Sequence, residues 1–174
     1  MTIERIGVIG AGQMGNGIAH VLALAGYDVV MDDINKETLA KALERIDKNM
    51  HRQAARGLIK SDAIEPALKR IRVTQALDDM KDRELVIEAA TEDEPTKKKI
   101  FQELCPRLSD KALIATNTSS ISVTRFSAES RTSTRFATSL RASAVGLPPT
   151  WMWVFRSLVP GSRASTAAPR TSST

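Results

Sequence analysis

Apolar and polar positions alternate along residues 1–124 in two ways, as short continuous apolar runs and as longer amphipathic stretches. The apolar runs predict β-strands at 5–10, 28–32, 71–74, 85–90 and 113–116. The amphipathic stretches predict helices at 16–25, 36–56, 61–70 and 94–108. Strands that alternate with helices in this order predict an α/β fold, a Rossmann-type, doubly wound and mostly parallel sheet.

The last fifty residues of the chain lose this pattern. Past Arg125 the periodicity fades, and Gly, Pro, Ser and Thr dominate after Ser157. We therefore predict one α/β domain at 1–125, with an alternative boundary at about residue 140. Residues 126–174 are predicted to form a divergent, basic, Ser/Thr-rich tail that is poorly ordered or partly packed.

The net charge of +5 comes entirely from that tail. Residues 125–174 hold seven Arg, no Lys and the single acid Glu129, whereas residues 1–124 hold 18 basic and 19 acidic side chains. No nucleic-acid motif or aromatic interleaving accompanies the tail, so no nucleic-acid partner is predicted.

Cysteine content and hydropathy exclude further classes of protein. The single Cys excludes a disulfide framework within the chain and a multi-cysteine metal site, and we predict no metal. No apolar run is long enough for a membrane span. The N-terminus lacks the pattern of a secretion signal, so we expect a cytoplasmic protein with no membrane partner.

A glycine motif follows the first predicted strand. Gly10, Ala11, Gly12, Gln13, Met14 and Gly15 form a G-x-G-x-x-G that opens the first predicted helix. In this context Gly10 makes a tight turn, Gly12 lets the backbone approach a diphosphate, and Gly15 lets the helix pack on the strand. Free N–H groups at the helix start favour an anion. The motif therefore predicts a dinucleotide site, with a plain tight turn as the structural alternative.

An acid about 20 residues further on is expected to bind the adenosine ribose. Asp32 and Asp33 lie there, and we assign this role to Asp33. A carboxylate accepts from ribose hydroxyls but repels a 2′-phosphate, so NAD is predicted rather than NADP. Two polar clusters follow later strands, Glu88 to Glu92 with Lys97 beyond, and Asn117 to Ser120. Each cluster alone is also compatible with ordinary turn chemistry.

Together these three motifs resemble the NAD-binding domain of the (S)-3-hydroxyacyl-CoA dehydrogenases, and the bacterial 3-hydroxybutyryl-CoA dehydrogenases in particular. The resemblance covers about residues 3–125. It implies oxidation of (S)-3-hydroxyacyl-CoA to 3-oxoacyl-CoA with NAD, in fatty-acid β-oxidation or butanoate metabolism. It also implies site roles: the glycine motif and Asp33 hold NAD, Glu92 and Lys97 contact its ribose and nicotinamide side, and Ser119 and Asn117 face cofactor and substrate. Arg52 and Arg56 would lie near the CoA, although exposed helix arginines are usually only solvated.

The chain departs from the family after residue 136. The family places a general-base His about twenty residues past Ser119, but Leu140 occupies that position here. His20 and His51 are the only histidines and fall on predicted helices in the first third of the chain. The residues past 136 do not resemble the family's helical C-terminal domain, which carries most of its homodimer interface, so we expect that domain to be missing. A fragment produced by frame slippage or truncation is one interpretation, and a diverged natural tail is the other. We expect the isolated chain to bind NAD without efficient turnover.

Two other functions remain open on the sequence. One is a related β-hydroxyacid dehydrogenase, which the Asn117–Ser120 turn fits less well. The other is a non-catalytic dinucleotide-binding or interaction module, in which Trp151, Trp153 and Phe155 form an adhesive apolar segment. The same segment is also compatible with a strand that caps the sheet edge.

Overall fold

The computed structural model describes residues 3–116 and the backbone of residues 135–138. A parallel sheet with the strand order β3-β2-β1-β4-β5-β6 forms the centre of the fold. The strands are β1 (Arg5–Ile9), β2 (Asp28–Asp32), β3 (Ile71–Thr74), β4 (Leu85–Glu88), β5 (Leu113–Thr116) and β6 (Arg135–Thr138). The strand order reverses between β1 and β4, which confirms the predicted Rossmann-type fold.

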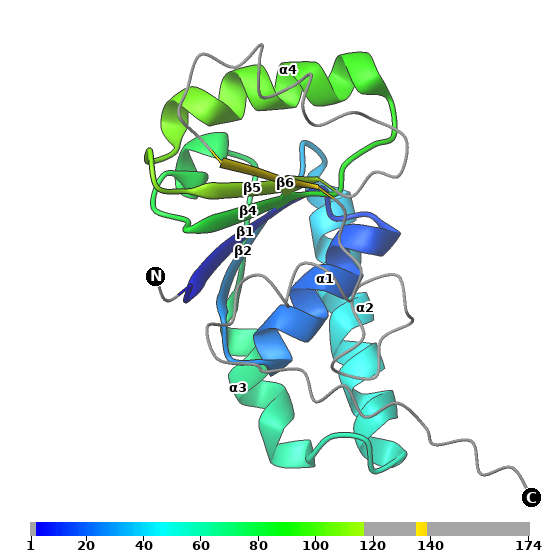
Figure 1. Cartoon of the computed structure of the whole chain (residues 1–174). Helices are drawn as coiled ribbons and strands as arrows, with labels where there is room; N and C mark the ends of the chain where they lie inside the picture. Colours follow the sequence, from blue (N-terminus) through cyan, green and yellow to red (C-terminus); the bar gives the residue numbers. More distant parts are fainter. Residues whose placement is uncertain (1–2, 117–134, 139–174) are drawn as a thin grey trace, which may run out of the picture. The chain divides into compact units, whose positions relative to one another are not determined.

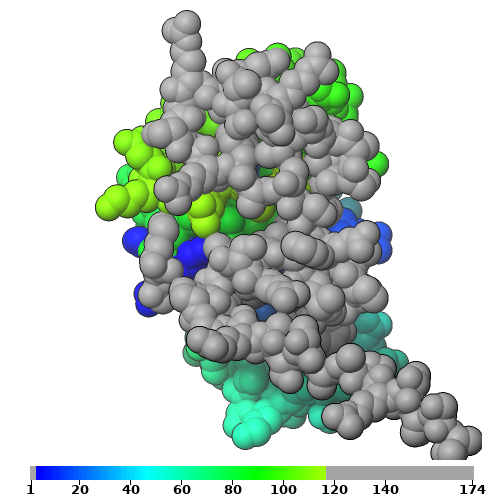
Figure 2. All heavy atoms as spheres, in the orientation of Figure 1, coloured from blue at the N-terminus to red at the C-terminus, as the bar shows by residue number. Residues whose placement is uncertain are grey.

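Helices cover both faces of this sheet. They are α1 (Gln13–Leu24), α2 (Lys36–Ala55), α3 (Ile64–Lys69) and α4 (Glu94–Leu104), with 3-10 turns η1 (Ser61–Ala63), η2 (Leu77–Met80) and η3 (Cys105–Arg107). Figure 1 shows α4 on one face of the sheet and α1 and α2 on the other. In the same orientation, the α4 end and the α2–α3 end lie at opposite ends of the described unit (Figure 2).

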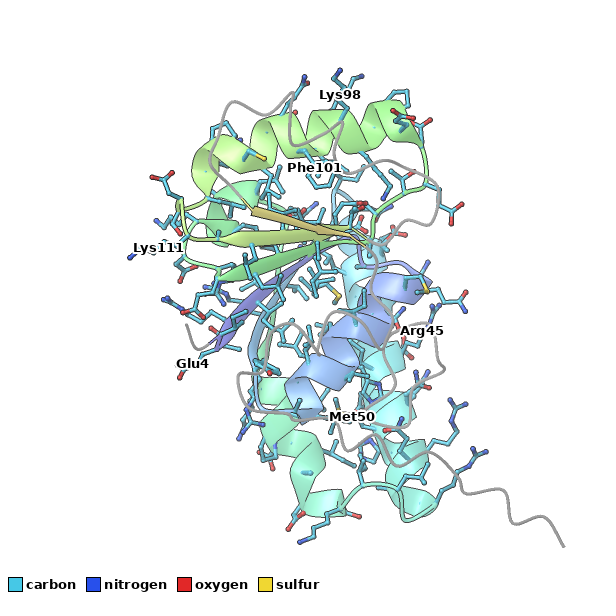
Figure 3. All side chains as sticks on the ribbon, in the orientation of Figure 1. Glu4, Arg45, Met50, Lys98, Phe101 and Lys111 are labelled. Atoms are coloured by element: carbon cyan, nitrogen blue, oxygen red, sulfur yellow. The ribbon has the colours of Figure 1, made fainter. Side chains whose placement is uncertain are left out.

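Alternate strand residues supply the core on the two faces. Val30, Val86 and Ile114 pack with Phe101 and Leu104 of α4 in one buried cluster. In Figure 3, Phe101 points from α4 toward the sheet, whereas Lys98 points away from it. On the other face, the buried residues Val8, Val29 and Met31 of the strands and Leu22, Leu39 and Ile46 of the helices form the second half of the core.

Side chains at the helix starts explain where α2 and α4 begin. The Asn35 side chain accepts hydrogen bonds from the N–H groups of Glu37 and Thr38, at 2.8 and 3.3 Å. Asp93 accepts from the N–H of Thr96 at 2.9 Å, and Pro95 occupies the first turn of α4. These contacts satisfy donors that a helix leaves unpaired at its N-terminus.

The structure corrects several predicted boundaries. α1 begins three residues earlier than predicted, at Gln13, because the last part of the glycine motif already forms its first turn. β4 ends at Glu88, where the side chain of that residue accepts from the N–H of Ala90 and turns the chain away from the ladder. The α-helix predicted to reach residue 108 ends at Leu104 and tightens into η3, since Pro106 has no N–H to donate.

Two elements were missed by the sequence analysis. One is the short turn η2, and the other is β6, which pairs in parallel with β5. β6 is only four residues long and stands in a Ser- and Thr-rich stretch, so its pattern carries little signal. Because 117–134 and 139–174 lie outside the described residues, the boundary of the domain and the nature of the tail stay predictions.

Candidate functional site

The carboxyl ends of β1, β2 and β4 meet beside the glycine motif, at the point where the strand order reverses. Gly10 has a φ of 94°, and a Cβ there would stand 2.4 Å from the Cα of Ala90. At Gly15 a Cβ would stand 1.6 Å from the carbonyl oxygen of Gly10. These two glycines are therefore required by packing within the chain itself.

Gly12 differs from both neighbours in the motif. A Cβ built at Gly12 meets no heavy atom within 4 Å, and its backbone has the extended φ of −61° and ψ of −166°. Packing among the described residues therefore gives no reason for a glycine here. The open space at Gly12 fits a ligand that approaches the backbone closely, as a diphosphate does.

The N-terminus of α1 is available to an anion. Gly12 is its N-cap, no side chain caps the helix, and its first turn contains no acidic residue. Gln13 and Met14 are exposed in that turn. The first N–H groups of a helix have no partner within it, and its dipole favours negative charge there.

Asp33 ties the loop after β2 to the glycine turn. Its carboxylate accepts from the N–H of Ala11 at 2.9 Å and from the N–H of Asn35 at 2.9 Å. Ala11 is buried, whereas Asp33 is partly exposed. Asp33 is thus held beside the glycine motif with carboxylate lone pairs still available, as the ribose role predicted for it requires.

Asp32, the other acid of the pair, is buried at 5% exposure. Burial raises the pKa of Asp32 to about 6, and the nearby carboxylates of Asp33 and Asp79 add to this rise. Among the described residues, no side chain or backbone group forms a hydrogen bond or ion pair with its carboxyl group. The position of Asp32 in the sequence does not reveal this isolation, because the partners of a buried side chain depend on the tertiary fold.

A cavity of about 680 Å³ opens next to Asp32 and Asp33. Residues that follow β1, β2, β3 and β4 line it together with one side of α4. They include Gly10, Asp32, Asp33, Ile34, Gln75, Leu77, Thr91, Lys99 and Arg107. Ile34, which also lines the cavity, is a 92% exposed residue. A partly apolar cavity beside the glycine turn suits the adenosine part of a dinucleotide.

Lys97 lies in a buried network and not at the surface of the cavity. Its ammonium group pairs with the carboxylate of Glu88 and donates to the Thr116 hydroxyl at 3.3 Å. The Thr116 hydroxyl in turn donates to Glu88 at 2.7 Å, and Glu88 also accepts from the N–H of Ala90 at 2.9 Å. All three side chains are almost fully buried. This network fixes the ends of β4 and β5 to α4.

The remaining predicted site residues fall into two groups. Glu92 is exposed in the turn that follows β4, near the cavity-lining Thr91. Asn117 and Ser119, and with them Leu140, lie outside the described residues. The structure therefore brings together the glycine motif and Asp33, with Glu92 on the neighbouring turn.

Arg52 and Arg56 lie at the other end of the unit, on the last turn and the C-cap of α2. Both are exposed, and Arg52 donates to the side chain of Asn49 at 2.8 Å. A second cavity, of about 470 Å³, lies between α2 and α3, and neither arginine lines it. The structure thus places the two arginines away from the glycine turn and outside the lining of both cavities.

Neither histidine reaches the larger cavity. His20 is buried on α1, where its Nε2 lies 3.2 Å from the side-chain oxygen of Gln53, and burial lowers its pKa. His51 is exposed and pairs with Asp47 on α2. Within the part of the chain that the structure describes, no three His, Cys, Asp or Glu side chains are grouped as a metal site would need.

The chain matches a known family along most of its length. Residues 5–139 match the NAD-binding domain of 3-hydroxyacyl-CoA dehydrogenase. The chain belongs to this family. It is 48% identical over 77% of its length to a 3-hydroxybutyryl-CoA dehydrogenase of Bradyrhizobium diazoefficiens, and 40% identical over 74% to one of Mycobacterium tuberculosis. It spans only 46% of either relative.

Solved structures agree with this family assignment. A crystal structure of (S)-3-hydroxybutyryl-CoA dehydrogenase from Ralstonia eutropha superposes with a TM-score of 0.76 at 36% identity. The match covers 79% of this chain and 49% of that one. The predicted family and its cofactor, NAD, are therefore confirmed, and the glycine turn with Asp33 is the part of the described structure that fits the cofactor. Within the described residues, no helix is both long and apolar enough to cross a membrane.

Proposed function

We propose that this chain supplies the NAD site of a 3-hydroxybutyryl-CoA dehydrogenase. The reaction converts (S)-3-hydroxyacyl-CoA and NAD⁺ into the 3-oxoacyl-CoA, NADH and a proton. The observation that carries the proposal is the open space at Gly12 beside Asp33, at the reversal point of the parallel sheet. The names of the relatives support the substrate class, and a cytoplasmic location remains part of the proposal.

The described residues would hold the cofactor in two places. The N–H groups at the start of α1 would bind the diphosphate, and Asp33 would accept from the adenosine ribose. NAD, when bound, supplies the acceptor for the hydride that leaves carbon 3 of the substrate. Glu92 would contact the nicotinamide side.

Asn117 and Ser119 would face the substrate oxygen, as in the family that the chain resembles. Lys97 would contribute to the site indirectly, because its ammonium group holds the carboxyl ends of β4 and β5 in place.

The hydroxyl proton needs an acceptor, and the family's general-base position holds Leu140 in this chain. A leucine side chain cannot take up a proton. We therefore propose that the chain binds NAD without efficient turnover of the acyl-CoA substrate. Formation of NADH from 3-hydroxybutyryl-CoA and NAD⁺, followed at 340 nm, would test this part. A rate comparable to that of an intact relative, measured in parallel, would refute it.

The cofactor site is tested by a pair of glycine variants, one at the N-cap of α1 and one inside that helix. Gly12→Ala adds a methyl group where the structure has open space, so the fold is kept while the approach of a diphosphate is blocked. Gly17→Ala also meets nothing within 4 Å and serves as the control. We expect NADH affinity, measured by fluorescence titration, to fall at least about tenfold in Gly12→Ala and to be unchanged in Gly17→Ala. Equal affinities in the two folded variants would overturn the proposed site.

A further inference from the structure

The isolation of Asp32 is a feature that the proposed cofactor site does not explain. Asp32 ends β2, where it pairs in register with Ile9 of β1 and Thr74 of β3. Asp32 is 95% buried, and it nevertheless lines the 680 Å³ cavity. Buried polar groups are nearly always hydrogen-bonded, and those that are not commonly face a ligand or water.

Charged groups from each neighbouring element face this cavity. They are Asp33 after β2, Asp78 of η2, Lys99 and Glu103 of α4, and Arg107 of η3. Asp79 of η2 does not line the cavity but lies close enough to Asp32 to act on its charge. The Arg107 guanidinium donates to Asp78 at 2.7 Å, and Asp79 accepts from the hydroxyl of Thr74 at 2.6 Å. The groups that act most on Asp32 are the two acids Asp33 and Asp79. No cation is arranged to stabilise an ionised Asp32 within the described residues.

We propose that Asp32 is a second nucleotide-facing acid, and that this domain binds NAD with the Asp32 carboxyl protonated and donating a hydrogen bond to the adenosine part of the cofactor. The inference rests on the proposed cofactor site. The carbonyl oxygen of Asp32 accepts from the N–H of Gly10 at 2.8 Å, so the residue adjoins the turn that would receive two diphosphate charges. A protonated carboxyl avoids repulsion from those charges and can donate to a ring nitrogen or ribose oxygen of adenosine.

This arrangement links nucleotide binding to proton uptake. In the free chain the pKa of Asp32 is already raised to about 6, and the two negative charges of a bound diphosphate would raise it further. The affinity for NAD is then constant below about pH 5.5 and weakens as the pH rises through 6 to 7.5. If NAD binding raises the pKa of Asp32 by a further half unit to one unit, the affinity at high pH is about three- to tenfold lower than the affinity at low pH.

The test uses the whole chain and NAD⁺, which is stable in mild acid. Dissociation constants are measured by calorimetry at pH 5.5, 6.5 and 8.0 for the unaltered chain, for Asp32→Asn and for Asp62→Asn, an exposed acid on η1. We expect the unaltered chain and Asp62→Asn to lose about three- to tenfold in affinity between pH 5.5 and 8.0. The amide of Asp32→Asn resembles the protonated carboxyl. We therefore expect this variant to bind NAD⁺ with the same affinity at all three pH values.

A second measurement needs no variant. At pH 6.5, titrations in two buffers of different ionisation enthalpy report protons directly, and we expect the unaltered chain to take up a fraction of a proton per NAD⁺ bound. Affinity that does not depend on pH, no proton uptake, or a loss of affinity in Asp32→Asn at every pH would overturn the inference. If folded chain failed to bind NAD⁺ at any pH, the proposed cofactor site itself would be wrong, and this outcome is distinct from the others.

Discussion

Replacement of Asp32 by asparagine is expected to stabilise the fold at neutral pH. The side chain is buried, its pKa rises from 3.8 to about 6, and the acids Asp33 and Asp79 lie nearby. Because the folded-state pKa is raised, the folded chain favours the protonated carboxyl. Its unfolding free energy therefore decreases as the pH increases from about 4 to about 6. Asparagine keeps the shape of the side chain and removes this dependence.

The rise of about two pKa units sets the size of the effect. It corresponds to about 3 kcal/mol at pH 7.5, where the carboxylate of the unaltered chain is ionised in its buried position. The new amide also lacks a partner, which costs about 1 kcal/mol or more. We therefore expect Asp32→Asn to be about 1–3 kcal/mol more stable than the unaltered chain at pH 7.5, and no more stable at pH 3.5.

Urea unfolding followed by circular dichroism at several pH values between 3.5 and 8 measures this difference. The exposed Asp62→Asn variant is the control, and we expect its stability to stay within about 0.5 kcal/mol of the unaltered chain throughout. A difference for Asp32→Asn that was the same at all pH values would refute the reasoning, since a titrating group cannot produce it. A loss of stability at pH 7.5 would show that the carboxylate has a stabilising partner.

Two further substitutions test the packing around the site. Gly15→Ala is expected to lower the stability by more than about 3 kcal/mol or to prevent folding, because its Cβ would stand 1.6 Å from the oxygen of Gly10; a thermal unfolding temperature equal to that of Gly17→Ala would contradict this. Lys97→Met is expected to cost about 3–5 kcal/mol in urea unfolding, since it leaves the buried carboxylate of Glu88 without its cation. The double variant with Glu88→Gln should recover part of that loss, and a double variant as unstable as Lys97→Met alone would argue against an electrostatic cause.

Local sequence signals were sufficient for most of the fold. The strands at Ile71–Thr74 and Leu113–Thr116 have the predicted bounds, because each is a short apolar run between polar turns. The ends of β4 and α4 were placed wrongly, because a side chain that turns the backbone and a tightened last turn leave the hydrophobic pattern unchanged. β6 was missed, since its pairing with β5 is a contact between distant parts of the chain.

In the candidate site, too, local features could be predicted from the sequence, whereas contacts between distant residues could not. The spacing of the glycines and of Asp33 is a local property, and the structure places these residues side by side. The partners of Lys97 could not be inferred from spacing, because Glu88 and Thr116 are separated from it by 9 and 19 residues and meet only when α4 packs on the sheet. The isolation of Asp32 is likewise a property of what surrounds it in space.

The buried contact of Lys97 with Glu88 and Thr116 has a consequence for any attempt to shorten this protein. A fragment that stopped before Thr116 would keep a lysine and a glutamate in an apolar interior but lose the hydroxyl that bridges them. The smallest piece able to fold by itself should therefore extend at least through β5. Because one ammonium group anchors the ends of two strands, a change at Lys97 is also expected to displace the carboxyl ends of β4 and β5 together rather than separately.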